Sequence, residues 1–321
     1  MDLELGLQNE TVVVTGAGGQ IGKVIVDAFL SAGCFVGAFD IDESKFSKQH
    51  PNLFWVAVDT TDEKAMGLAW ESVEERFNST PTLCVCAAAL DLSFIHHHSS
   101  IIGMPTSQFR RTLEVNTVGT FITAKLWLEH VDRMSKADEK MANVANGSNG
   151  ANGANGANGA NGANGANGAN GTGAAGAQSH TEKRKNISLI ILGSEAGDLG
   201  VAGNPDYAAS KSAVQYGLVL SLAPDAARIH PSARVNSICP GAVDTRRFRE
   251  ECAEDAPGKL KWIEAESTVA QKKAVDVEGI AKMCLILASE IWSPSTTGQI
   301  IRLNGGKSGR LFWDEVGNAL W

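Results

Sequence analysis

Residues 15–22, with the sequence TGAGGQIG, decide the fold of this 321-residue chain. A β-branched apolar run at 11–14 precedes them and is typical of a buried parallel strand, and residues 23–32 have helical periodicity. Glycines let a backbone approach a phosphate, while the free N–H groups and the dipole of a helix N-terminus attract its charge. The pattern predicts a site for the pyrophosphate of a dinucleotide, formed by Gly16, Gly19, Gln20, Ile21 and Gly22.

An acidic residue, Asp40, ends the next apolar run at 34–39. An acid about 20 positions beyond the glycines is placed to bind the hydroxyls of the adenosine ribose. A carboxylate accepts hydrogen bonds from both hydroxyls but repels a 2′-phosphate, and Asp42 adds to that repulsion. The pattern favours NAD(H), while Lys45 and Lys48 leave NADP(H) possible. A structural turn with an ordinary surface aspartate is disfavoured, because strand, turn, helix, strand and acid occur in the required order.

A second motif, YAASK, runs from Tyr207 to Lys211 and begins thirteen residues after Ser194. On a helix, residues four apart share a face, so the Tyr207 hydroxyl and the Lys211 ammonium can meet in one pocket. An ammonium lowers the pKa of a tyrosine from about 10 toward the range where proton transfer is efficient. Ser194, arriving from a separate strand end, can hydrogen-bond the same reacting oxygen. These residues predict a proton-transfer site.

With these motifs, the chain resembles the compact single-domain branch of the short-chain dehydrogenase/reductase superfamily from about residue 5 to 306, apart from one insertion. The resemblance implies that Asn116 joins Ser194, Tyr207 and Lys211 in a catalytic tetrad. It also implies that Asp59 contacts the adenine ring. Residues 240–245 resemble the loop that covers the nicotinamide, and this places Val243 and Thr245 against the cofactor. Residues 304–306, NGG, stand where the family ends its last strand with Asp-Gly-Gly.

The activity that the resemblance implies is reversible hydride transfer between a nicotinamide and a carbonyl/alcohol pair. Tyr207 would donate the proton and Ser194 would polarise the carbonyl. Lys211 would lower the pKa of Tyr207 and bind the nicotinamide ribose, and Asn116 would hold a water. Two alternatives stay open: a non-catalytic dinucleotide sensor, and an extended-type dehydratase or epimerase, which the Gly19/Gly22 spacing favours.

The chain departs from the family pattern at three places. Gln20 stands where the compact branch has glycine, and Asn304 replaces an aspartate. Residues 86–89, CAAA, replace the usual Asn-Asn-Ala-Gly after the fourth strand and lose side-chain hydrogen bonds there. Since no tetrad residue is lost, these departures concern cofactor affinity more than chemistry.

Alternating strand and helix patterns predict one domain over residues 1–321 with a Rossmann-like α/β fold: a doubly wound, parallel, seven-stranded sheet with helices on both faces. The expected strands lie at about 11–15, 34–39, 53–58, 83–88, 187–193, 233–239 and 299–303. The expected helices lie at about 20–32, 62–77, 105–133, 205–230 and 276–289. Ligands of such folds bind at the carboxyl ends of the strands, where Asp40, Asp59, Ala89, Ser194 and Pro240 fall.

A compositional break at about 142–178 interrupts this pattern between the Asn116 helix and the strand before Ser194. Nine consecutive triplets fill residues 145–171, eight of them Ala-Asn-Gly and one Ser-Asn-Gly. With no apolar side chain larger than alanine to bury, ordering this segment would cost backbone entropy without return. We expect a disordered surface loop, because long insertions add little to the free energy of loop closure.

The composition is that of a soluble cytoplasmic enzyme acting on a small-molecule carbonyl or alcohol. A net charge of −8 argues against nucleic acid or anionic membranes as partners, and no apolar run approaches the roughly 18 residues that span a bilayer. Four of the six cysteines fall in predicted strands, which favours reduced thiols. The run His96-His97-His98 is expected to be a surface loop, so no metal site is predicted. By resemblance, the helices at 105–133 and 205–230 would form a homodimer or homotetramer.

Overall fold

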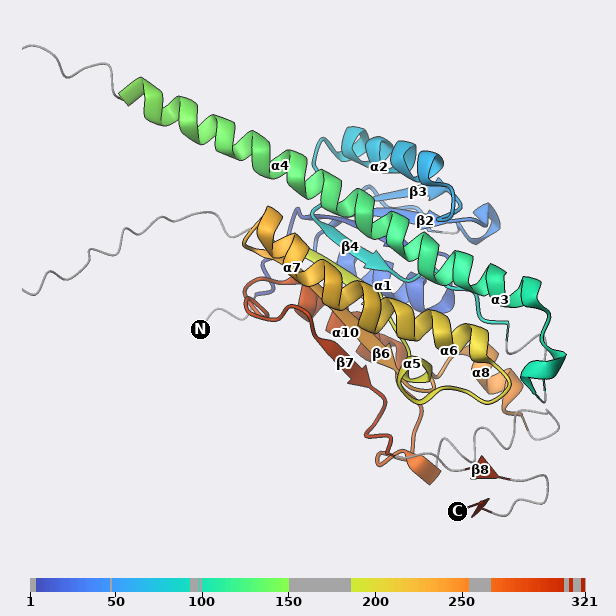
Figure 1. Ribbon diagram of the computed structural model, residues 1–321. Coiled ribbons are helices and arrows are strands. Elements are labelled where there is room, and N and C mark those ends of the chain that lie inside the picture. Colours follow the sequence, from blue (N-terminus) through green and yellow to red (C-terminus); the bar gives the residue numbers. More distant parts are fainter. Residues whose placement is uncertain are drawn as a thin grey trace, which may run out of the picture.

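A computed structural model describes residues 4–46, 48–92, 98, 100–149, 186–253, 267–308, 312–313 and 319–320 of the chain. The chain folds into three layers, with a parallel sheet between two sets of helices (Figure 1). The sheet has the order β3-β2-β1-β4-β5-β6-β7, and every neighbouring pair is parallel. The predicted doubly wound α/β fold is therefore confirmed. Its strands are β1 (Thr11–Thr15), β2 (Phe35–Asp40), β3 (Leu53–Ala57), β4 (Leu83–Cys86), β5 (Ile187–Leu192), β6 (Ala233–Pro240) and β7 (Ile300–Leu303).

The α-helices are α1 (Gln20–Ser31), α2 (Glu63–Phe77), α3 (Thr106–Leu113), α4 (Gly119–Asn149), α5 (Glu195–Leu199), α6 (Pro205–Ser212), α7 (Val219–Ile229), α8 (Arg246–Glu251) and α10 (Val277–Ala288). Short 3₁₀ turns are η1 (Glu43–Lys45) and η2 (Ile101–Gly103), and π-helical turns are η3 (Glu114–Val118) and η4 (Ala213–Leu218). The strands β8 (Phe312–Trp313) and β9 (Ala319–Leu320) pair in a separate antiparallel ladder.

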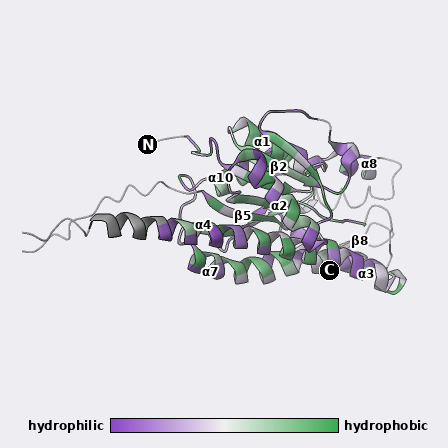
Figure 2. Cartoon of the chain, turned by 90° about the horizontal axis from the view of Figure 1, so that it is seen from above, coloured by the Kyte–Doolittle hydropathy of each residue, from purple (hydrophilic) through white to green (hydrophobic). Residues whose placement is uncertain are grey.

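Each face of the sheet has its own apolar core. On one face, α2, α4 and α7 pack on a cluster that contains the fully buried Trp70 and Trp127. On the other face, α1 and α10 pack together (Figure 2), and Ile25 and Phe29 of α1 are fully buried in the second apolar cluster. Such burial on both faces explains why the strands are continuous apolar runs instead of alternating ones. Trp127 also donates a 2.9 Å hydrogen bond to the carbonyl of Thr82, so its one polar atom is paired inside the core.

The predicted start of the insertion is wrong. Helix α4 continues to Asn149 and projects beyond the sheet, so residues 142–149 are helical and not a loop (Figure 1). Adding a residue to an existing helix fixes one residue per hydrogen bond and avoids the cost of nucleation, so a helix can run into a sequence that would not start one. The remainder of the predicted loop, residues 150–178, lies outside the described residues.

The topology brings the ends of several strands together. The chain runs outward in both directions from β1 and β4, and the main-chain N–H of Ala87 donates 3.2 Å to the carbonyl of Thr15 at this junction. A doubly wound sheet forms its ligand crevice at such a switch in strand order, beyond the carboxyl ends of the strands. Within the part of the chain that the structure describes, no helix has the length and apolar character needed to cross a bilayer.

Candidate active site

At two positions of the turn between β1 and α1, the surrounding backbone leaves no space for any residue larger than glycine. Gly16 has a φ of +66°, and a Cβ there would lie 2.6 Å from the backbone of Ala88. A Cβ on Gly22 would lie 2.1 Å from the carbonyl oxygen of Gly16. The N-cap, Gly19, offers no side chain to the helix, so the N–H groups of the first turn at Gln20 and beyond are left for another partner. This arrangement fits the pyrophosphate of a dinucleotide.

Asp40 ends β2 beside this turn, and its carboxylate is only 6% exposed. Its two oxygens accept hydrogen bonds from the main-chain N–H groups of Gly18 (2.9 Å) and Asp42 (3.1 Å). The Lys45 ammonium lies 3.4 Å away, and a Cβ added to Gly18 would lie 2.7 Å from the Cβ of Lys45. A fixed carboxylate and a cation therefore lie side by side next to the glycine turn.

Asp59 follows β3 at the same edge of the sheet. One carboxylate oxygen accepts hydrogen bonds from the N–H (2.9 Å) and the hydroxyl (2.8 Å) of Thr61. The other lies 3.9 Å from the guanidinium of Arg111 on α3. The side chain is 34% exposed, so it is held in place but still partly accessible to solvent.

Asn116 lies buried in the π-helical turn η3. Its side chain accepts a hydrogen bond of 2.6 Å from the N–H of Leu90 and donates one of 3.0 Å to the carbonyl of the same residue. It also donates to the hydroxyl of Ser210, 2.9 Å away, which precedes Lys211. Asn116 therefore ties the segment after β4 to helix α6.

Ser194, Tyr207 and Lys211 come together at the end of β5. The Ser194 hydroxyl oxygen accepts a hydrogen bond of 3.1 Å from the N–H of Ala196, and the same hydroxyl is close enough to the Tyr207 phenol to lower its pKa. The Lys211 ammonium donates to the carbonyl of Leu192 at 2.8 Å and lies 5.6 Å from the centre of the Tyr207 ring. The structure thus places the three predicted residues in one cluster, with Asn116 linked to it through Ser210.

Helix α6 is anchored by the residue that precedes Tyr207. The buried carboxylate of Asp206 accepts hydrogen bonds from the hydroxyl of Thr112 (2.8 Å) and the amide of Gln108 (3.2 Å), both on α3. The Gln108 oxygen in turn lies 3.0 Å from Nε2 of His98, and because that oxygen can only accept, the imidazole donates. His96 and His97 lie outside the described residues. No group of three or more possible metal ligands occurs among the residues that the structure describes.

The electrostatics of the cluster differ from the expectation. Burial raises the pKa of Tyr207 well above its ordinary value, the negative charge of Asp91 raises it further, and the hydrogen bond from Ser194 opposes both. Burial also lowers the pKa of Lys211 to about 8. The prediction of a lowered Tyr207 pKa is therefore wrong for the polypeptide alone, because burial of the phenol outweighs the lowering effect of Ser194.

The segment after β6 reaches back over the crevice. Val243 pairs with Val275, and the Thr245 hydroxyl accepts a 3.1 Å hydrogen bond from the N–H of Phe248 as the N-cap of α8. At the next residue, the N–H of Arg246 donates 2.8 Å to the side-chain oxygen of Gln20. Gln20, which stood out in the sequence as a departure, thus links the glycine turn to α8. Nothing in the sequence pattern pointed to this contact, because the two residues are 226 positions apart.

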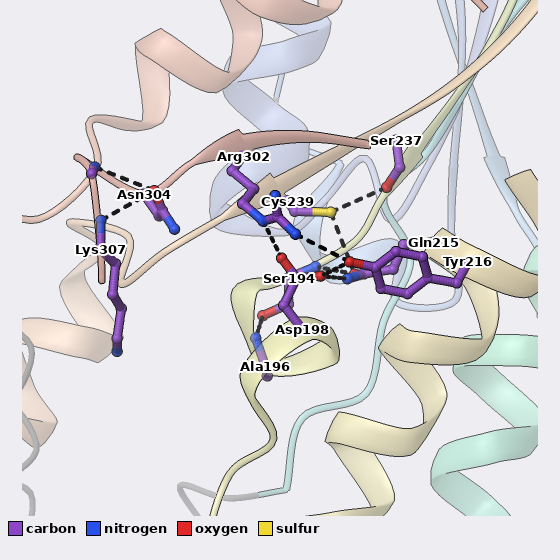
Figure 3. A network of polar contacts seen from close by, with 11 residues as sticks. Ser194, Ala196, Asp198, Gln215, Tyr216, Ser237, Cys239, Arg302, Asn304 and Lys307 are labelled. Carbon is purple, nitrogen blue, oxygen red and sulfur yellow. Dashed lines mark hydrogen bonds and ion pairs between the residues drawn. The ribbon is translucent and has the colours of Figure 1, made fainter. Parts of the chain in front are cut away.

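Two charged contacts beside Ser194 were also missed from the sequence. Glu195 forms an ion pair of 3.1 Å with Lys307, in which both side chains are largely buried. The carboxylate of Asp198 accepts hydrogen bonds from the side chains of Gln215, Tyr216 and Arg302 (Figure 3). The position of Gln215, four residues after Lys211, is a signal that spacing alone offers, since it continues the helix face of Tyr207 and Lys211.

Comparison with known proteins agrees with this geometry. The family model described as "short chain dehydrogenase" matches residues 10–156, and one described as "Enoyl-(Acyl carrier protein) reductase" matches residues 170–308. A short-chain dehydrogenase/reductase homolog of Bacillus subtilis, YusR, is 35% identical over 129 residues, which cover 40% of this chain and 88% of the relative. Dehydrogenase/reductase SDR family member 6 of Danio rerio is 24% identical over 306 residues, covering 94% of this chain and 98% of the relative.

Solved structures share the fold. A short-chain type dehydrogenase/reductase from Mycobacterium ulcerans has a TM-score of 0.70 at 20% identity, covering 94% of this chain and 92% of its own. A 7α-hydroxysteroid dehydrogenase, solved with NADH and 7-oxo glycochenodeoxycholic acid, has a TM-score of 0.67 at 19% identity, covering 95% and 96%. ElxO, solved with NADP bound, has a TM-score of 0.67 at 18% identity, covering 93% and 98%.

The chain belongs to the short-chain dehydrogenase/reductase family. It is accordingly an NAD(P)-dependent oxidoreductase that acts on a CH–OH/C=O pair of a small-molecule substrate.

Proposed function

We propose that Ser194, Tyr207, Lys211 and Asn116 form the active site of a reversible alcohol dehydrogenase or carbonyl reductase. The observation that supports this most directly is the meeting of the three side chains at the end of β5, where Ser194 acts on the pKa of Tyr207 and the Lys211 ammonium lies 5.6 Å from the centre of the Tyr207 ring. A bound nicotinamide dinucleotide supplies or accepts the hydride, and the chain supplies the proton and the orientation.

Each residue has a role that follows from its contacts. Since the Ser194 oxygen already accepts from Ala196, its proton is free to be donated toward the oxygen of Tyr207 or of a substrate. Tyr207 gives its proton to the carbonyl oxygen in the reduction direction and takes it back in oxidation. The charged form of Lys211 favours the Tyr207 phenolate and so opposes the effect of burial. Asn116 positions the segment after β4 and Ser210 relative to Ser194, Tyr207 and Lys211 through its hydrogen bonds.

Tyr207→Phe tests this assignment. Loss of a general acid costs roughly 10²–10⁴-fold in turnover, so the variant should be nearly inactive on any alcohol or carbonyl that the wild type converts. Its dissociation constants for dinucleotides should stay close to those of the wild type. Ser31→Ala, which removes an exposed hydroxyl from the last residue of α1, is the control and should keep full activity. Turnover of Tyr207→Phe at the wild-type rate would remove Tyr207 from the mechanism.

For the cofactor, we propose a preference for NAD(H). The Asp40 carboxylate is held by two main-chain N–H groups at the end of β2, where it can accept from ribose hydroxyls and repel a 2′-phosphate. Lys45 pairs with Asp40 and weakens that repulsion without removing it. Binding of NADH and NADPH, followed by energy transfer from tryptophan, should show tighter NADH in the wild type and a smaller ratio in Asp40→Asn. Tighter NADPH in the wild type would overturn the assignment.

We further propose a cytoplasmic homodimer or homotetramer built on helices α4 and α7. These helices lie side by side on one face of the molecule (Figure 2). Phe121 on α4 and Leu220 on α7 are each 49% exposed, and Val118, in the turn just before α4, is 38% exposed. Phe121→Lys together with Leu220→Lys should lower the mass measured by light scattering to that of one chain. An unchanged mass would place the interface elsewhere.

A further inference from the structure

Gln215 continues the line of polar side chains that starts with Tyr207 and Lys211. The three residues are spaced by four, so they follow one another along one face of the helical arm formed by α6 and η4. Gln215 is fully buried, at 0% exposure. A buried carboxamide must be hydrogen-bonded to be tolerated, and its partners therefore indicate what it holds in place.

Those partners lead directly to Ser194. The side-chain oxygen of Gln215 accepts a hydrogen bond of 3.0 Å from the main-chain N–H of Ser194 and one of 3.4 Å from the thiol of Cys239. Its side-chain nitrogen donates to the carboxylate of Asp198 at 2.6 Å (Figure 3). The main-chain N–H of Ser194 can only donate and the carboxylate of Asp198 can only accept. These two partners therefore determine which end of the Gln215 amide is oxygen and which is nitrogen.

Asp198 is held as firmly as Gln215. Its carboxylate, 7% exposed, accepts a hydrogen bond of 2.5 Å from the Tyr216 hydroxyl and forms an ion pair with the guanidinium of Arg302 on β7. Arg302 also donates to the Tyr216 hydroxyl at 3.2 Å. The negative charge that orients Gln215 is thus compensated by a cation anchored on the last strand of the sheet.

The backbone at Gly193 and Gly197 packs closely against the side-chain amide of Gln215. A Cβ added to Gly193 would lie 2.6 Å from the Gln215 oxygen, and one added to Gly197 would lie 2.7 Å from the carbon of its amide group. Gly193 and Gly197 flank Ser194 in the sequence, so the segment that carries Ser194 closes around this side chain.

We propose that Gln215 and Asp198 are a positioning pair that fixes the backbone of Ser194 and so sets its hydroxyl opposite that of Tyr207. Turn η4 then holds Ser194 through its N–H, and helix α6 holds the carbonyl of Leu192, two residues earlier, through Lys211. Neither Gln215 nor Asp198 needs to touch the substrate. The proposal rests on the proposed function of Ser194 and Tyr207.

The test compares four variants with the wild type. Gln215→Met keeps the length of the side chain and removes both hydrogen bonds. Gln215→Glu keeps an oxygen for the Ser194 N–H but sets a second carboxylate against Asp198. Asp198→Asn combined with Gln215→Glu reverses the donor and the acceptor between these two side chains and restores the two hydrogen bonds of residue 215. The Tyr216 hydroxyl, which donates to the same Asp198 oxygen in the wild type, then accepts from the new amide. Gln8→Met, on an exposed glutamine, is the control.

We expect Gln215→Met to lower kcat by about 10–100-fold with KM and dinucleotide binding nearly unchanged, because misplacing one reacting group by about 1 Å costs that much. Gln215→Glu should be impaired to a similar degree, and the double variant should recover at least about tenfold of that loss. Hydrogen exchange at the peptide containing Ser194 should be faster in Gln215→Met and slow again in the double variant.

An unchanged kcat in a folded Gln215→Met, or a double variant no better than Gln215→Glu, would overturn the proposal. If Gln215→Met does not fold, the comparison of Gln215→Glu with the double variant decides alone. Failure of the proposed function has a different signature: a wild type that binds no dinucleotide and converts no alcohol or carbonyl. Hydrogen exchange at Ser194 would in that case still report whether Gln215 holds its N–H.

Discussion

The side-chain oxygen of Gln20 accepts a hydrogen bond of 2.8 Å from the main-chain N–H of Arg246, and this contact joins the first turn of the sheet to the segment after its sixth strand. Strands β4 and β5 lie between β1 and β6, so the two anchor points start about 14 Å apart at the usual spacing of strands. The contact therefore spans the crevice in which the dinucleotide is expected to lie.

Gln20→Ala should accelerate dissociation of NADH or NADPH. A hydrogen bond of this kind contributes about 1 kcal/mol, which corresponds to roughly a fivefold change in the dissociation constant. Stopped-flow energy transfer from tryptophan to the reduced nicotinamide measures the rate, with Gln8→Ala as a control for an exposed glutamine outside the crevice. Equal dissociation rates in all three proteins would show that the Gln20–Arg246 contact does not hold the cofactor.

Gly22→Ala should destabilise the fold and weaken dinucleotide binding. The added methyl would lie 2.1 Å from the Gly16 carbonyl oxygen, and forcing such a contact apart costs about 1–3 kcal/mol. Gly67→Ala is the matched control, because nothing lies within 4 Å of its added methyl in the middle of α2. That substitution should stabilise by about 0.5–1 kcal/mol, since alanine is the better helix former. Urea unfolding of both variants separates the effects, and similar shifts in both would contradict the expectation.

Lys211 should make stability depend on pH. Its pKa is lowered by burial from 10.5 to about 8, so between these values the unfolded chain binds more protons than the folded one. Stability contributed by this group is then lowest below pH 8 and rises as the pH approaches 10.5, by on the order of 3 kcal/mol in total. In Lys211→Met this rise is absent. The difference between the two urea-unfolding free energies should therefore grow with pH in favour of the wild type, and parallel curves would refute the assignment.

Arg234 should be among the most costly side chains to remove outside the active site. It is 2% exposed, and its guanidinium donates to the carbonyls of Leu287 (2.5 Å) and Ala288 (2.9 Å) at the end of α10 and to the Ser293 hydroxyl (2.7 Å). Arg234→Met leaves these groups unpaired and should cost about 2–4 kcal/mol. Arg228→Met removes an arginine that is 76% exposed and should change stability by less than about 0.5 kcal/mol. Thermal unfolding compares the two, and equal losses would show that the buried contacts contribute nothing.

The parallel sheet was predicted correctly because the alternation of strand and helix patterns is a local property of the sequence. The glycine turn with Asp40, and Tyr207 with Lys211, are also defined by local spacing, and their roles in the site stay predictions. The extension of α4 to Asn149 was missed because the composition of residues 142–149 was judged by itself. An existing helix can continue into such a segment without the cost of nucleation.

The contacts that could not be predicted depend on tertiary structure. Asp198 and Arg302 are 104 residues apart and meet only because β7 docks beside β6 in the sheet. The direction of the pKa shift of Tyr207 depends on how much protein surrounds it, which no sequence motif states. Gln215 could have been proposed from its spacing, but its role required the contact with Ser194.

Tyr207 and Tyr216 are the only two tyrosines in the chain, and both belong to the helical arm that holds Ser194. Every phenol signal of this protein therefore originates within the proposed active site or the hydrogen-bonded network around Asp198 and Gln215. Tyrosine labelled with ¹³C would give two resonances, of which Tyr216→Phe assigns one. The protein thus carries a built-in spectroscopic probe that can follow cofactor binding, substrate binding and proton movement without any attached label.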